Sequence, residues 1–563
     1  MSHRLDLALI EKDLARDALE PAGQMKWLRQ SYDDPAAFWR ALLEAHNGLF
    51  PWPGKSSPFR SYGFYHDIVA RNLRSPSPAL RWYRENYGWQ ELSYEQLGRL
   101  AGRKAAQWAR LGAGAGQKLC IVSYLNEQFV IAFLAALKTG LIVSFLPPWG
   151  RSFLKKRIDA LSPDFIWSEE QNFPLLARFR HLILAEGASV GGEEESSSSH
   201  SYAAGEAFAF CYDPSAPSPH VPRELTSDAA YLGAVRDGMI ALGIKPGHAV
   251  AAPGLCVMEA QPALLLACLL AGATFVHLDE DDVARAPKLL VDRPLRAVGV
   301  TPAIREMLLE KPVAVGKGWD SWFRDPAASQ DMECWKDFVD AMGLHDAYSV
   351  NQKWNASLGG CVLFSIRRKG TPHLHVLPAS GVPWRLADPA DQERESLWSH
   401  GLFSVCPPGG EESVITGGIL AGSRNEWMFL RPVLSGHLGR CYPVGEVLDV
   451  LSAIPHGSSC TVAEVPSAGA SSLSRFVLLV FVGGRKVDEP AIAQSLRKRV
   501  LLELGKEFVP DHIQIIYLHP RRGEDGSIDH GWCTREYISG GLLRRTRGEV
   551  FLCITELRDL IHL

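Results

Sequence analysis

The 563-residue sequence has no long uninterrupted apolar run and no Cys-x-x-Cys pair. Acidic residues break the apolar runs near its start, so we expect no signal peptide. The longest apolar stretches, such as Gln261–Val276, are too short for a membrane span and are expected to form core. Eleven scattered cysteines without a framework spacing predict reduced thiols, a cytoplasmic location and no structural zinc or other metal site.

An excess of charge of either sign is also missing. Lys and Arg number 59 and Asp and Glu number 63, which gives a formal net charge of -4. This balance excludes a strongly basic nucleic-acid-binding protein and a polyacidic tail protein. With 46% hydrophobic and 22% charged residues, the composition is that of a globular protein, and the length predicts several domains.

Short apolar runs alternate with helical segments along the first two thirds of the chain. Lys118–Tyr124 is expected to be a strand, Glu127–Thr139 a helix that ends at Gly140, and Leu141–Leu146 the next strand. The pattern resumes with an expected strand at Phe208–Tyr212 and an expected helix over Thr226–Leu242, and it continues to about residue 310. This β-α-β order predicts parallel strands covered by helices.

After about residue 430 the pattern changes. Two expected strands, Ser459–Val465 and Phe476–Val482, precede a helix over Glu489–Leu504 and a last strand at Ile513–Leu518. The sequence thus predicts three parts: an N-terminal extension over residues 1–90, a large α/β domain over 91–435, and a small α+β domain over 436–563.

Four segments follow one another in a recognisable order: LSYEQLGRLAGRKAAQWARLGAGAGQKLCIV, FLAALKTGLIVSFLPP, GAVRDGMIALGIKPGHAVAAP and ACLLAGATFVHLD. Together they resemble the adenylate-forming enzymes, which include acyl-CoA synthetases, nonribosomal-peptide adenylation domains and luciferases. The resemblance runs from about Leu92 to Asp529. It implies a large two-part α/β N-terminal domain of the acyl-CoA synthetase type and a small α+β C-terminal domain. In such enzymes a carboxylate attacks the α-phosphate of ATP, and a thiol of CoA or a carrier protein then takes the acyl group.

The family's phosphate-binding loop reads close to Y-T-S-G-T-T-G-x-P-K-G, where glycine backbone N–H groups approach phosphate. The matching segment here, Cys211–Val221, reads CYDPSAPSPHV and keeps only the proline, at Pro219. It contains no glycine, and its added prolines have no N–H to donate. His220 stands where the lysine would be, with Arg223 nearby. We therefore expect an ordinary loop that binds no phosphate.

The adenine and magnesium loop of the family reads Y-G-x-T-E and aligns with Tyr348–Gln352. Tyr348 matches, Asn351 takes the threonine position, and Gln352 replaces the glutamate that would hold magnesium. A neutral amide is a poor Mg²⁺ ligand compared with a carboxylate. Two interpretations stay open, a relic of the nucleotide site and an ordinary surface loop.

The ribose-binding motif T-G-D corresponds to Thr416, Gly417 and Gly418. Gly418 has no side chain that could accept hydrogen bonds from the ribose hydroxyls. The arginine that follows in the family is best matched by Arg431, near the expected hinge, although a solvated surface arginine is the simpler interpretation.

The catalytic lysine of the small domain falls in a G-K-I-D context in the family. The segment Gly526–Asp529 here reads GSID, which places Ser527 at the lysine position. A hydroxyl group cannot place a full positive charge on transition-state oxygens. Arg521 and Arg522 lie close in sequence and are candidates for partial compensation.

The acyl-pocket strand of the family is often followed by P-x-x-H, with the histidine near the acyl group. Here Cys256 stands at the histidine position, and Cys256 and Met258 are the acyl-pocket candidates. Cys256 and Ser527 are the only catalytic candidates. A cysteine at this place could carry an acyl group as a thioester, but both Cys256 and Cys211 are more simply interpreted as small core residues.

Four parts of the nucleotide site are thus changed together, so we expect the fold without standard adenylation. The function we favour is transfer of an acyl or aryl group between CoA and a carrier protein, without ATP, in a biosynthetic pathway. The alternatives are a noncatalytic protein that binds a carboxylate, a carrier protein or a paralogue, and a divergent ATP-dependent ligase. The expected cofactor is a CoA or phosphopantetheine thioester rather than ATP and magnesium. No nucleic acid or membrane partner is expected.

Overall fold

The computed structural model describes residues 5–15, 25–50, 61–184, 198–214, 216, 218–313, 315, 318–326, 332–388, 391, 394–396, 400–408, 413–423, 426–430, 442, 444–452, 459–465, 475–523 and 526–546. The chain divides into two compact units. Unit 1 holds Met1–Pro148 and Lys156–Cys441, and unit 2 holds Trp149–Lys155 and Tyr442–Leu563. The domain boundary expected at residue 435 lies outside the described residues. None of the described helices is long and apolar enough to cross a membrane.

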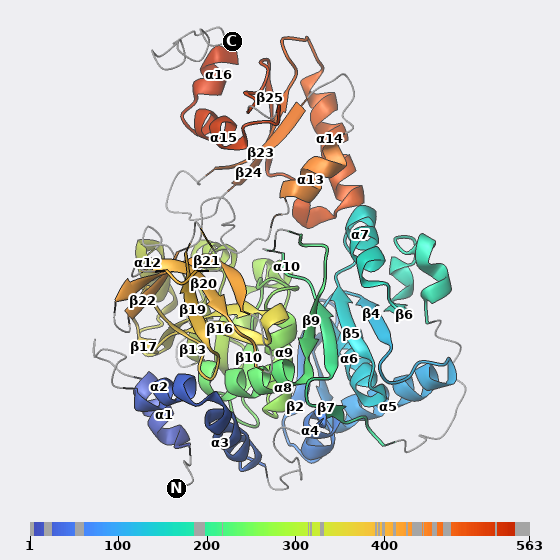
Figure 1. Ribbon diagram of the computed structural model, residues 1–563, viewed down its shortest axis with the longest axis vertical. Helices are drawn as coiled ribbons and strands as arrows, with labels where there is room; N and C mark the ends of the chain where they lie inside the picture. Colours follow the sequence, from blue (N-terminus) through green and yellow to red (C-terminus); the bar gives the residue numbers. More distant parts are fainter. Residues whose placement is uncertain are drawn as a thin grey trace. The chain divides into compact units, whose positions relative to one another are not determined.

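The largest sheet of unit 1 has eight strands (Figure 1). Its six central strands are parallel, and each edge strand is antiparallel to its neighbour. This arrangement is the one that the β-α-β order of the sequence predicts. In spatial order the strands are β17 (Arg368–Lys369), β14 (Tyr348–Asn351), β13 (Trp319–Arg324), β12 (Leu295–Gly299), β10 (Ala249–Ala251), β11 (Thr274–His277), β2 (Pro78–Arg84) and β3 (Gly88–Ser93).

A second sheet of five strands carries the segment that aligns with the family's phosphate-binding loop. Four strands are parallel, and the last, β9, forms an antiparallel hairpin with β8. The helix α6 (Glu127–Thr139) connects β4 to β5; Asn126 caps its start and Gly140, at φ +83°, ends it. The strands in order are β6 (Phe165–Ser168), β4 (Lys118–Val122), β5 (Ile142–Leu146), β8 (Ala207–Cys211) and β9 (Arg223–Thr226).

The third sheet of unit 1 is antiparallel and has seven strands. The sequence pattern assigned no elements to this part of the chain. Its strands in order are β15 (Lys353–Asn355), β16 (Gly360–Phe364), β18 (His375–Pro378), β22 (Glu426–Leu430), β21 (Val414–Ser423), β20 (His400–Val405) and β19 (Trp384–Ala387). A further short pair joins β1 (Ser61–Tyr62) to β7 (Tyr202–Ala203).

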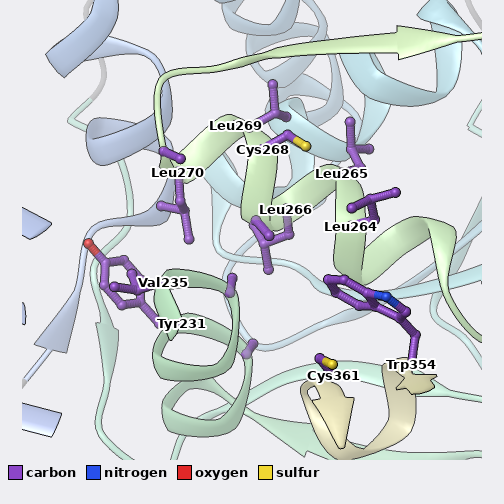
Figure 2. Close-up of a cluster of buried hydrophobic side chains, with 14 of the residues drawn as sticks. Tyr231, Val235, Leu264, Leu265, Leu266, Cys268, Leu269, Leu270, Trp354 and Cys361 are labelled. Carbon is purple, nitrogen blue, oxygen red and sulfur yellow. The ribbon is translucent and has the colours of Figure 1, made fainter. Parts of the chain in front are cut away.

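Helices bury the faces of these sheets. The helix α9 is apolar on all sides, which is typical of a fully buried helix. Its leucines gather with Tyr231 and Val235 of α8 and with Trp354 of β15 in the main core (Figure 2). The helices of unit 1 are α1 (Leu7–Leu14), α2 (Lys26–Asp33), α3 (Pro35–Asn47), α4 (Phe64–Ile68), α5 (Tyr94–Arg110), α6, α8 (Ser227–Arg236), α9 (Gln261–Leu270), α10 (Glu280–Arg285), α11 (Pro302–Glu310) and α12 (Met332–Met342), while α7 (Arg151–Leu161) carries residues of both units.

Unit 2 is a small α+β unit with its own core. Its sheet contains β23 (Ser459–Val465), β24 (Arg475–Phe481) and β25 (His512–Ile516). Its helices are α13 (Val444–Leu451), α14 (Glu489–Glu503), α15 (His530–Ile538) and α16 (Gly541–Thr546). Buried residues such as Leu479, Ile516 and Cys533 form the core. The predicted fold class, a large α/β part and a small α+β part, is confirmed.

Candidate functional site

The segment expected to replace the phosphate loop is the turn of the β8–β9 hairpin. The pairing of Cys211 with Arg223 closes the hairpin. The Tyr212 hydroxyl donates to the backbone oxygen of Arg157 at 2.8 Å, and the Asn355 amide donates to the Asp213 carboxylate at 3.1 Å. The start of the turn is therefore fixed by internal bonds. His220 lies half-buried in the turn and makes no hydrogen bond to another described residue.

The residues aligned with the magnesium loop lie inside the fold. Tyr348–Asn351 is the strand β14, so the surface-loop interpretation is wrong. The Asn351 amide donates to the backbone oxygens of His373 and His375 at 2.8 and 2.9 Å. The Gln352 side chain is 1% exposed, donates to a backbone oxygen at 2.7 Å and accepts from an indole N–H at 3.1 Å. Both ends of its amide are thus bonded within the protein, and this neutral, buried group does not fit a magnesium site.

The ribose motif forms part of β21. The Thr416 hydroxyl is buried and donates to the backbone oxygen of Phe403 at 3.0 Å. Gly417 belongs to the same strand. A Cβ atom on Gly418 would stand 2.1 Å from Cζ of Phe429, so an aspartate there would overlap the ring. These positions do not fit a ribose anchor, and Arg431 lies outside the described residues.

Ser527 lies in an exposed turn of unit 2. Its backbone oxygen accepts from the Gly523 N–H at 2.9 Å. Arg522 donates to the backbone oxygen of Gly526 at 2.6 Å, and Arg521 lies 3.7 Å from the carboxylate of Asp529. Both arginines therefore contact groups of their own turn, and these contacts do not direct their charges toward a ligand site.

An apolar pocket lies within unit 1, lined by residues of the five-stranded sheet and of the helices α6, α8 and α9. Met258, Leu266 and the small residues Ala230, Ala234 and Ala263 form one side of it. Six aromatic side chains form much of the rest: Phe129, Phe133, Phe145, Phe208, Phe210 and Tyr212.

The pocket contains no activated nucleophile. Burial raises the pKa of the Cys211 thiol to about 12, so this lining residue stays protonated near neutral pH. Cys256 is not among the lining residues; its backbone oxygen accepts from the N–H groups of Ala260 and Gln261 at the start of α9. Of the two expected acyl-pocket residues, the structure therefore places Met258 in this pocket and Cys256 outside it.

Two polar pairs adjoin the lining residues along the chain. Glu259 follows Met258 and forms a buried ion pair with Lys353, with a distance of 2.5 Å between Oε1 and Nζ. The second is the bond between Asp213 and Asn355, next to Tyr212 and Ala356. None of these four residues is among those that line the pocket, so its lining remains apolar. Among the described residues, no group of acidic, histidine or cysteine side chains could hold a metal ion.

No protein-family model matches the chain, and no curated protein matches it. Solved structures do. The amide bond synthetase McbA from Marinactinospora thermotolerans has a TM-score of 0.67 at 13% identity, covering 84% of this chain and 99% of its own. A double mutant of o-succinylbenzoate CoA synthetase (MenE) from Bacillus subtilis has a TM-score of 0.63 at 13% identity, covering 83% and 97%. At this identity the likeness concerns the fold, and the chain has the fold of these two synthetases.

Proposed function

We propose that the protein binds an acyl or aryl thioester in the apolar pocket of unit 1 and moves the acyl group between CoA and a carrier-protein thiol without ATP. The pocket carries this proposal, because its apolar lining suits the hydrocarbon part of an acyl or aryl group. The proposal also fits the positions of Gln352, Thr416 and Gly418, which are used in internal bonds and packing rather than in a nucleotide site.

The reaction balances without a further reactant. The thiolate of the acceptor attacks the thioester carbonyl, one carbon–sulfur bond forms, and the bond to CoA breaks. CoA leaves as a thiolate and takes up the proton that the acceptor lost. One thioester replaces another, so no phosphate bond is needed to drive the step. The solved structure of the MenE double mutant contains a product analogue, OSB-NCoA, which shows that this fold accommodates a CoA-type ligand in that protein.

A noncatalytic binding protein is the second candidate. One observation favours it: among the described residues that line the pocket, the one thiol, that of Cys211, has a pKa raised to about 12 by burial. Thiol-to-thiol transfer needs no protein nucleophile, whereas a route through a cysteine thioester does. A protein that only binds the acyl group would keep the pocket and show no transfer.

The test uses the full chain, decanoyl-CoA and pantetheine as the acceptor thiol, in the absence of ATP. Formation of decanoyl-pantetheine above the uncatalysed rate is the expected result. Binding of decanoyl-CoA without transfer would favour the noncatalytic candidate. Decanoate-dependent exchange of pyrophosphate into ATP would contradict the proposal and support the ligase.

Replacing Ser527 with lysine, the residue that the family has at this position, is not expected to produce adenylation activity. In Ser527→Lys, a lysine stands on the exposed turn of unit 2, but Gln352 and Gly418 in unit 1 still offer no place for magnesium or ribose. Catalytic groups that act as a unit are strongly non-additive, so one returned member contributes little. Pyrophosphate exchange by Ser527→Lys and Ser527→Ala should be equal across a panel of fatty, aryl and amino acids. A clear gain in the lysine variant alone would show a working nucleotide site.

A further inference from the structure

We propose that the apolar pocket of unit 1 selects an unsubstituted hydrocarbon acyl chain and rejects chains with polar groups on the part that enters the pocket. This inference rests on the proposed function, because it names the substrate class of the same site. Amino acids, hydroxylated aryl acids and dicarboxylates are thereby excluded as the acyl group.

The chemistry of the lining carries the first step. Among the described lining residues, the polar side-chain groups are the thiol of Cys211 and the Tyr212 hydroxyl, and the hydroxyl already donates to the backbone oxygen of Arg157. Because burial raises the pKa of the Cys211 thiol to about 12, that group carries no charge. A hydroxyl, amine or carboxylate on the buried part of a ligand would lose its water and gain no partner. A hydrocarbon chain has no hydrogen bonds to water that burial would remove.

Small and large residues both line the pocket. Ala230 and Ala234 lie four residues apart and therefore share one face of α8. Ala263, in the first turn of α9, is half-buried and lines the same space. Phe129 and Phe133 share a face of α6 in the same way and also line the pocket.

Side-chain size at the alanines should therefore set the longest chain that fits. Ala263→Leu adds a branched side chain at a half-buried position, so it can enter the pocket without displacing packed core. Ala234→Leu adds the same group at a buried position of α8. Ala109→Leu, on the exposed face of α5, is the matched control for the substitution itself.

The experiment is isothermal titration of the full chain with neutral S-acyl-N-acetylcysteamine thioesters whose chains run from acetyl to dodecanoyl. We expect Kd to fall about fourfold with each added methylene until the pocket is full. The ω-hydroxydecanoyl thioester should bind about tenfold more weakly than the decanoyl thioester. In Ala263→Leu and Ala234→Leu the affinity should stop rising at a shorter chain, and in Ala109→Leu it should follow the unmodified protein.

A Kd that does not change with chain length would overturn the inference, and so would equal affinity for the ω-hydroxy chain. If Ala234→Leu does not fold, Ala263→Leu still decides the question, because an unchanged chain-length limit in that variant contradicts the assignment. Acyl transfer to pantetheine is measured separately. Failed transfer with intact chain-length dependence overturns the transferase proposal alone, whereas transfer with flat binding overturns only the chain selection.

Discussion

Replacing Asp237 with alanine is expected to lower the free energy of unfolding by about 3–5 kcal/mol. Asp237 is fully buried at the end of α8, and its carboxylate accepts from Nε of Arg236 at 2.7 Å and from the backbone N–H of Cys361 at 2.6 Å. Arg236 in turn donates to the backbone oxygen of Cys361 at 2.6 Å. These bonds join α8 to β16. Without the carboxylate, Nε of Arg236 and the backbone N–H of Cys361 stay buried and lose this acceptor. Removing one partner of a buried pair destabilises a protein more than replacing both partners does.

Urea unfolding of the full chain, followed by tryptophan fluorescence, measures this effect. Asp320→Ala is the matched control, because its ion pair with Arg296 leaves the Asp320 side chain 58% exposed and such pairs contribute about 1 kcal/mol or less. Asp237→Asn should fall between the two, since an amide oxygen can still accept from Cys361. Equal unfolding midpoints for Asp237→Ala and Asp320→Ala would contradict the role given to this pair.

Elements that depend on local signals could be predicted closely. The helix expected over Glu127–Thr139 has those bounds in the structure, because Asn126 and Gly140 define its ends through side-chain capping and a left-handed turn. The strand expected over Ser459–Val465 is also found with those bounds. The helix expected over Thr226–Leu242 differs: α8 ends at Arg236, and a π-helical turn, Asp237–Ala241, follows. At this turn the Asp237 carboxylate accepts from the backbone N–H of Cys361, a contact so distant in sequence that no local signal indicates it.

The candidate nucleotide site was less accessible to sequence reasoning. The alignment placed Gln352 by its spacing from Tyr348, and spacing does not show whether a polar residue faces solvent. Gln352 is buried because a backbone oxygen 111 positions away, at Ala241, accepts from its amide. The same holds for Gly418: only the position of Phe429 shows that no side chain fits there. Partners far away in sequence decided both cases.

The pocket had a weak signal in the sequence. Phe129 and Phe133 are four apart on a helix, and Phe208 and Phe210 alternate along a strand, so each pair could be assigned to one face. Such faces usually pack as core. Here a pocket lies among them, and small residues of another helix, such as Ala230, also line it. Sequence patterns give the faces but not the volume left between them.

Acid is expected to destabilise unit 1 before its carboxylates are protonated. Burial, with the nearby Arg71, lowers the pKa of His46 from 6.5 to about 4. Burial, with Arg368 and Arg324, lowers the pKa of His373 to about 3. The unfolded chain therefore takes up these protons first as pH falls. The stability is complete above about pH 6.5 and decreases toward the folded-state pKa values, by on the order of 3 kcal/mol for each histidine at pH 4.

The measurement is the urea midpoint of the full chain at several pH values between 7 and about 4. His46→Gln and His373→Gln remove one titrating group each, so the slope of stability against pH should become shallower in both, whatever their stability at pH 7. His345→Gln is the matched control, because the His345 side chain is 65% exposed, and it should keep the slope of the unmodified protein. Asp67, whose pKa is lowered by its bonds to His66, Arg71 and Tyr231 against the effect of burial, adds its own loss only below its ordinary pKa of 3.8. An unchanged slope between pH 6.5 and 4 in both buried-histidine variants would therefore show that other groups cause the acid sensitivity, and that His46 and His373 are not held neutral by the fold.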